Sequence, residues 1–255
     1  MFIGPKIFKD DSISEDPVCV RAIEYISTDE EFNLPIFDYR GNPMYSSMIS
    51  KLCNFSHRND FIVRILRDLI TESPCAQIMV LAHQRKILSY IHDAVVHNNI
   101  ATVGYYVGGT KQVVLKETEE KQIVLATFSM AAEALDIKTL STLFMVTPKS
   151  DIIQSVGRIL RAKHETPIIV DLVDSHSIFK NQFVKRRQFY KKNNYRIRSV
   201  SMTSYTGFKD MKHWKSVFEP RVSKHDLLND EDIECHKPNV SIIEDVKLGT
   251  CMVEL

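Results

Sequence analysis

Apolar and polar residues alternate along the middle of the chain in a pattern typical of strands separated by helices. Short apolar runs predict buried strands at residues 77–82, 102–107, 122–127, 142–146 and 167–172. Apolar residues at helical spacing predict helices at residues 59–71 and 84–97. Because alternating strands and helices favour a parallel sheet with right-handed crossovers, we expect an α/β fold.

Both ends of the chain have a weaker pattern. The first 42 residues contain a possible strand at 18–26 and a turn signal at 40–43, and beyond about residue 200 the periodicity fades. We therefore expect three parts. These are a leading segment at 1–42, a main domain at 43–199, and a tail or small subdomain at 200–255.

Composition sets outer bounds on the class of protein. With 255 residues, 44% hydrophobic and 25% charged, the chain can build one good core plus an appendage. It has no apolar run near the ~18 residues of a membrane span, and we expect no signal peptide and no membrane partner. Its five cysteines form no CxxC pair, so we expect reduced thiols and no metal site.

The positive charge is unevenly distributed although the net charge is only +1. Nine Lys or Arg and no acid lie between Asp174 and Asp210, and Lys185, Arg186 and Arg187 are the densest group. Five aromatic residues are interleaved with them. This pattern suits nucleic acid, because cations neutralise phosphates and rings stack on bases. The alternative is that the aromatics are core residues and only the charges face outward.

Candidate nucleic acid-binding residues follow three of the expected strands. These candidates are Thr127 and Ser129 after one strand, His83 and Gln84 after another, and Gly109 and Lys111 in a loop after a third. The carboxyl ends of parallel strands form the usual ligand crevice. Hydroxyls and backbone N–H groups there can hold phosphates without reading bases. The alternatives are a plain helix cap, a structural histidine and an ordinary turn.

A helix is expected to close the unit that follows residue 146, and it carries Gln154, Gly157, Arg158 and Arg161. The two arginines are three apart, so they lie on one helix face. Their planar forks suit phosphate, and an arginine brought to a transferring phosphoryl group raises the rate about 10³- to 10⁵-fold. The alternative is that both arginines are ordinary solvated charges on the surface of the helix.

Four stretches occur in the order of the motifs of superfamily 2 helicases, over roughly residues 36–198. Residues 80–83 (VLAH) resemble motif IV, 104–111 (GYYVGGTK) the strand and loop after it, 126–136 motif V, and 154–161 (QSVGRILR) motif VI. The sequence of these stretches most resembles that of helicases of large cytoplasmic DNA viruses, such as the poxvirus transcript-release helicase and its African swine fever virus counterpart.

The resemblance implies a three-layer RecA-like fold with a mainly parallel sheet, the second of two such domains. ATP then lies between the domains and the nucleic acid strand across both. It implies that Arg158 and Arg161 are arginine fingers and that Gln154 orients the attacking water or contacts the phosphates. Gly157, Asp136 and Glu133 would complete the ATP-binding surface of this domain. Ala134 stands where the family usually has glycine, so if that position needs φ > 0 the loop must differ from the family's.

A Walker A loop requires Gly-Lys followed by Ser or Thr, and none of the eight glycines precedes a lysine. We therefore expect the C-terminal half of a nucleic acid-dependent ATPase, with ATP and Mg²⁺ held mainly by a first RecA-like domain in cis or trans. The expected location is cytoplasmic, including a viral factory or virion, and not secreted. The alternative function is a stand-alone nucleic acid-binding or regulatory module without catalysis.

Overall fold

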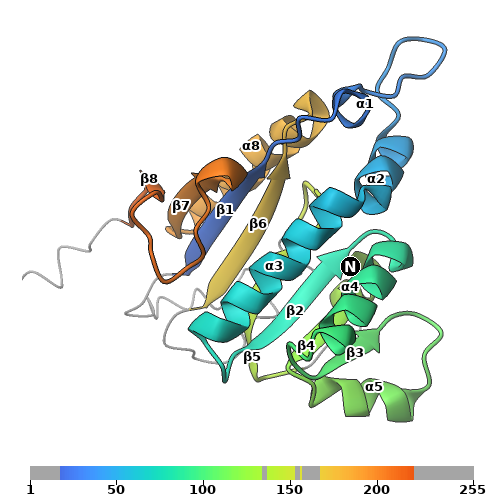
Figure 1. Ribbon diagram of the computed structural model, residues 1–255, viewed down its shortest axis with the longest axis vertical. Helices are drawn as coiled ribbons and strands as arrows, with labels where there is room; N and C mark the ends of the chain where they lie inside the picture. The colour runs from blue at the N-terminus through green and yellow to red at the C-terminus, as the bar shows by residue number, and fades with distance from the viewer. Residues whose placement is uncertain (1–17, 134–136, 153–155, 157–166, 221–255) are drawn as a thin grey trace, which may run out of the picture. The chain divides into compact units, whose positions relative to one another are not determined.

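The computed structural model describes residues 18–133, 137–152, 156 and 167–220. Within them, eight strands form one sheet in the order β3-β4-β2-β5-β6-β1-β7-β8 (Figure 1). The strands are β1 (Cys19–Tyr25), β2 (Gln77–Ala82), β3 (Val103–Tyr106), β4 (Ile123–Thr127), β5 (Leu140–Met145), β6 (Ile168–Asp174), β7 (Arg196–Ser201) and β8 (Lys215–Phe218). Neighbours pair in parallel, except that β8 runs antiparallel to β7.

All five strands expected from the apolar runs are present, and so is the possible strand near the start of the chain. That strand, β1, lies inside the sheet, paired with β6 on one side and β7 on the other. The sheet thus draws strands from all three expected parts of the chain. The boundaries at residues 42 and 199 stay predictions.

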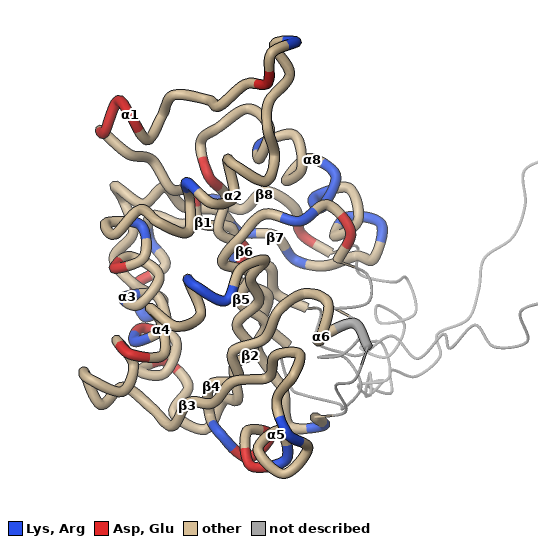
Figure 2. The backbone as a smooth tube through the Cα atoms, turned by 90° about the vertical axis from the view of Figure 1, so that its right-hand side faces the viewer, with Lys and Arg blue, Asp and Glu red and all other residues tan. Residues whose placement is uncertain are grey.

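Helices cover both faces of the sheet, which gives the expected three-layer α/β fold. They are α1 (Glu30–Asn33), α2 (Tyr45–Asn54), α3 (Ser56–Glu72), α4 (Arg85–His97), α5 (Gln112–Glu119), α6 (Phe128–Glu133), α8 (Ser177–Lys192) and the 3₁₀ turn η1 (Met202–Ser204). In Figure 2, α3 and α4 lie on one side of the strands and α6 and α8 on the other. None of the described helices is long and apolar enough to cross a membrane.

The side chains of β2 show why a fully apolar run forms a central strand. Ile78, Val80 and Ala82 pack into the core under α2, α3 and α4. Met79 and Leu81, which point the other way, pack into the second core with α6. Successive strand residues face opposite sides, so a strand covered by helices on both faces must be apolar throughout.

Two arginines are buried in ion pairs with β6 and also bind the loop after β5. Arg58 donates to both carboxylate oxygens of Asp174, at 2.6 and 2.8 Å, and to the carbonyl of Val146 at 2.7 Å. Arg186 donates to both oxygens of Asp171 at 2.8 Å and to the carbonyl of Lys149 at 2.8 Å. The β5 loop is therefore held at both ends by buried charges.

The first prediction concerns Arg58, which is fully buried with its partner. Arg58→Met should lower the free energy of unfolding by about 3–5 kcal/mol, because it leaves the Asp174 carboxylate buried without a cation. Adding Asp174→Leu should recover much of the loss. The control is Lys180→Met in the exposed pair with Glu24, expected to cost at most about 1 kcal/mol. Urea unfolding measures all three, and an Arg58→Met protein as stable as the control would contradict the prediction.

Candidate functional site

The carboxyl ends of β3, β4, β2 and β5 lie next to one another at one edge of the sheet, since these strands are parallel neighbours. Most of the polar residues expected from the sequence follow these ends directly. His83 and Gln84 come after β2, and Thr127 ends β4. The fold therefore brings together candidates that lie far apart in the sequence.

His83 lies in a chain of hydrogen bonds that joins three segments. Its backbone N–H donates to Thr147 Oγ1 at 3.0 Å, and its ring Nδ1 lies 2.8 Å from the same oxygen. On the other side of the ring, Nε2 lies 3.3 Å from the hydroxyl of Tyr45, the first residue of α2. That hydroxyl donates to the carbonyl of Pro148 at 2.7 Å. The ends of β2 and β5 and the start of α2 are thus tied together.

These partners determine which ring nitrogen of His83 carries the hydrogen. Tyr45 gives its one hydroxyl hydrogen to Pro148, so it accepts from His83, and Nε2 must be the donor. A neutral imidazole protonated at Nε2 accepts at Nδ1. The hydroxyl of Thr147 therefore donates to Nδ1 while its lone pair accepts the backbone N–H of His83.

Burial of the imidazole, followed by the nearby charge of Lys149, lowers the pKa of His83 from 6.5 to about 4. The ring is therefore neutral at physiological pH. Because the folded-state pKa is the lower one, the unfolded chain takes up the proton first as pH falls. The stability that neutral His83 provides is present above pH 6.5 and is lost as the pH falls through about 4. We infer that His83 orders this edge and carries no charge to a phosphate.

A cation stands beside the ordered network. The Lys149 ammonium lies 4.9 Å from the ring centre of Phe128, the first residue of α6. The same ring lies 4.8 Å from that of His83. Phe128 therefore contacts both the neutral imidazole and the positive charge.

Thr127 and Ser129 stand at the junction between β4 and α6, as expected. Thr127 Oγ1 and Ser129 Oγ lie 3.2 Å apart, and Ser129 is exposed. The two hydroxyls are hydrogen-bonded to each other, so one of them donates within the pair and the hydrogen of the other is available to a phosphate oxygen. A hydroxyl in such a position can contact a phosphate without reading bases.

The glycine-rich loop after β3 joins the same edge through Arg85, whose guanidinium hydrogen-bonds the carbonyl of Gly108. Gly109 has φ +82° and is exposed, a conformation that glycine adopts most readily. Lys111 is exposed immediately before α5. Gln84, by contrast, donates to Ser50 Oγ at 2.7 Å, so its amide is hydrogen-bonded to α2.

The three basic residues of α8 differ from one another. Lys185 is exposed and Arg187 is partly exposed. Arg186, however, is buried against Asp171, so its expected contact with nucleic acid is wrong. The interleaved aromatics follow the core alternative: Phe179 and Tyr190 are fully buried. The hydroxyl of Tyr190 also donates to Asp171 at 3.0 Å.

Most of the residues expected at the ATP side lie outside the described residues. These are Gln154, Gly157, Arg158, Arg161 and Asp136. Glu133 ends α6, but its side chain is not described. In the described part of the chain, no group of three His, Cys, Asp or Glu residues is arranged to hold a metal ion.

Sequence reasoning missed three residues of this edge: Tyr45, Thr147 and Lys149. Thr147 and Lys149 follow β5 just as His83 follows β2, so the rule of polar residues at strand ends was sufficient to find them. Tyr45 had no comparable signal. It stands at the start of a helix over a hundred residues from Pro148, and only the fold brings the two together.

The second prediction concerns the protonation of His83. In an NMR titration of the ring nitrogens, His83 should titrate near pH 4. Lys149→Gln should raise this pKa, because it removes a nearby positive charge, but burial should still keep it below 6.5. The control is Lys116→Gln on the exposed face of α5, which should leave the pKa unchanged. An imidazole that titrates near 6.5 in the unmodified protein would contradict the buried, neutral assignment.

Comparison with known proteins gives relatives in viruses. No family model matches the chain. The chain is 33% identical over 207 residues to "Putative ATP-dependent RNA helicase L396" of Acanthamoeba polyphaga mimivirus, a match that covers 77% of this chain and 39% of that protein. The chain thus spans well under half of this relative. It is also 40% identical over 72 residues to uncharacterized protein 108L of Invertebrate iridescent virus 3, covering 28% of this chain and 69% of that one.

Among solved structures, T4 UvsW shares the fold, with a TM-score of 0.56 and 21% identity over 76% of this chain and 43% of that one. The shared fold agrees with the order of motifs IV to VI in the sequence and with the mimivirus relative. The sequence similarity to the mimivirus protein and the fold shared with T4 UvsW support the expected C-terminal RecA-like domain of a superfamily 2 helicase, with viral relatives.

Proposed function

We propose that this chain is the C-terminal half of a nucleic acid-dependent ATPase or helicase. In this role the carboxyl edge of its sheet binds the sugar–phosphate backbone of one strand. Arg158 and Arg161 act as arginine fingers on ATP, which is held mainly, with Mg²⁺, by a first RecA-like domain. The mimivirus relative, whose name describes an ATP-dependent RNA helicase, supports both ATP and nucleic acid as ligands.

The observation that carries the proposal is the ordered edge around His83. A surface that binds any sequence must offer donors at fixed positions to phosphates and ignore the bases. Here Thr127 and Ser129 offer hydroxyls and Lys149 offers a charge. The network through Thr147 and Tyr45 holds the end of β5, which carries Lys149, and the ring of Phe128 at the start of α6 packs on His83 of the same network.

The ATP chemistry falls to residues of the stretches that resemble motifs V and VI. When bound, Mg²⁺ and ATP supply the phosphoryl group and the metal charge that neutralises it. Arg158 and Arg161 would add positive charge at the γ-phosphate, Gln154 would orient water, and Gly157, Asp136 and Glu133 would line the nucleotide.

The third prediction tests binding to nucleic acid. The chain should bind single-stranded RNA or DNA of unrelated sequences alike, with a log–log salt slope of about −0.7 per phosphate contact. Lys149→Gln and Lys111→Gln should each flatten this slope by about 0.7. Thr127→Val should lower affinity and leave the slope unchanged, because a hydroxyl carries no charge. Fluorescence anisotropy across a salt series measures these effects.

A matched control for the third prediction is Lys212→Gln, an exposed lysine beside β8 at the far end of the sheet. It should leave both affinity and slope unchanged. If all three lysine variants behave alike, the strand does not run along the carboxyl edge.

The fourth prediction tests the arginine fingers. The isolated chain should show no ATP turnover above background, because it has no Walker A loop. Joined to a Walker A domain, Arg158→Ala or Arg161→Ala should cut turnover by at least ~100-fold and change nucleic acid affinity far less. Lys212→Ala is the control. Near-normal turnover in both arginine variants would favour the alternative of a binding module without catalysis.

A further inference from the structure

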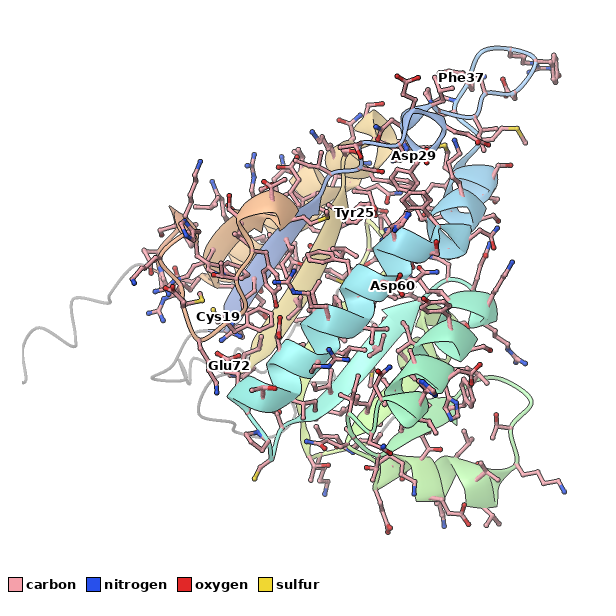
Figure 3. All side chains as sticks on the ribbon, in the orientation of Figure 1. Cys19, Tyr25, Asp29, Phe37, Asp60 and Glu72 are labelled. Atoms are coloured by element: carbon pink, nitrogen blue, oxygen red, sulfur yellow. The ribbon has the colours of Figure 1, made fainter. Side chains whose placement is uncertain are left out.

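A hairpin at residues 34–44, named here the aromatic hairpin, projects from the sheet edge described above. It is the blue loop at the upper right of Figure 1, and Phe37 is labelled on it in Figure 3. Phe37 and Pro43 form an antiparallel bridge. The Asp38 N–H donates to Asn42 O at 2.8 Å, and the Met44 N–H donates to Ile36 O at 2.8 Å. Backbone pairing along both arms makes it an ordered element.

The tip of the aromatic hairpin is a tight, hydrogen-bonded turn. Asp38 Oδ1 accepts the backbone N–H groups of Arg40 and Asn42, both at 2.8 Å. The N–H of Asn42, followed by that of Arg40, lowers the pKa of Asp38. Gly41 has φ +79°, which lets the chain reverse without strain. The carboxylate is thus engaged by the turn itself, while the Arg40 guanidinium stays available.

The base of the aromatic hairpin is fixed to the rest of the protein. The Lys51 ammonium donates to the carbonyl of Leu34 at 2.7 Å, and the Ile36 N–H donates to Met48 Sδ at 3.2 Å. The chain then passes directly into Tyr45, whose hydroxyl binds Pro148 beside His83. The hairpin therefore leaves the molecule at the edge proposed to hold the nucleic acid backbone.

Large apolar side chains on this ordered hairpin face solvent. Tyr39 is 88% exposed, Leu34 63% and Phe37 51%. The guanidinium carbon of Arg40 lies 5.0 Å from the ring centre of Tyr39. Scattered exposed apolar residues are ordinary, but several on one preorganised turn mark a binding surface. An aromatic ring with an arginine over it also offers flat faces to a planar ligand.

We propose that the tip of the aromatic hairpin, through Tyr39, Arg40 and Phe37, stacks on unpaired bases of the strand whose backbone lies along the carboxyl edge. This rests on the proposed function and adds a base contact to it. Stacking on rings and guanidinium planes is tolerant of sequence, because every base has a flat face. Continuity with the backbone edge through Tyr45 favours an unpaired base over a protein surface as the occupant.

The fifth prediction uses paired ligands that differ only in their bases: oligo(dT) and an abasic oligonucleotide of equal length. Tyr39→Ala should weaken oligo(dT) binding by about 5- to 150-fold, the effect of losing one base–aromatic stack. Abasic binding should not change. Tyr39→Phe is the matched control and should retain affinity for both. Tyr39→Trp should show fluorescence quenching with oligo(dT) and none with the abasic strand, measured against the parent protein, whose one tryptophan, Trp214, is buried.

Three results would overturn the proposal, and they are distinguishable. Equal loss, or no loss, of oligo(dT) and abasic binding in Tyr39→Ala would reject stacking and leave the backbone interface intact. Binding of neither ligand by the unmodified chain would reject the proposed function together with the hairpin contact. Self-association of the chain that disappears in Tyr39→Ala, with unchanged oligo(dT) binding, would make the tip a protein interface. Urea unfolding of each variant checks that the exposed substitutions leave the fold intact.

Discussion

The arrangement of the carboxyl edge of the sheet depends on two carboxylates of one buried strand. Asp171 and Asp174 lie on β6, and each holds a buried arginine that reaches across to a carbonyl of the loop after β5. A buried ion pair contributes little net stability by itself, since desolvation opposes its attraction. Here each guanidinium also satisfies a main-chain oxygen. The pairs therefore determine where the loop lies more than how stable the protein is.

The loop after β5 links the two buried ion pairs to the carboxyl edge of the sheet. Val146 is held by Arg58, Lys149 by Arg186, and the carbonyl of Pro148 between them by Tyr45. With its carbonyls engaged, the loop has few alternative conformations, and the Thr147 hydroxyl faces the His83 ring. The imidazole remains neutral because burial, and then the nearby charge of Lys149, lowers its pKa. Preorganised donors then cost little reorganisation when a strand binds.

Much of the fold could be predicted from the sequence, because buried parallel strands are apolar on both faces. The position of β1 in the sheet could not be predicted. Its apolar run indicates that the strand is buried, but it does not indicate which strands lie beside it. β7 was hidden inside a basic segment, where only Ile197 and Val200 are buried and its other residues are polar or charged. The resemblance to helicase motifs predicts a site at the carboxyl edge of the sheet, but side-chain contacts there depend on partners distant in sequence.

Arg186 shows that charge alone mispredicts whether a side chain is exposed, and that helical periodicity predicts it correctly. It stands seven residues after Phe179 and four before Tyr190, so all three share one helical face. Both neighbours are fully buried, and the arginine enters the core with them. Lys185 and Arg187, one position away on either side, point outward to different degrees. The buried charge is tolerated because the Asp171 carboxylate neutralises it, and the hydroxyl of Tyr190 donates to the same carboxylate. A run of three basic residues thus divides by helical phase into one structural cation and two surface cations, a distinction that counting charges cannot make.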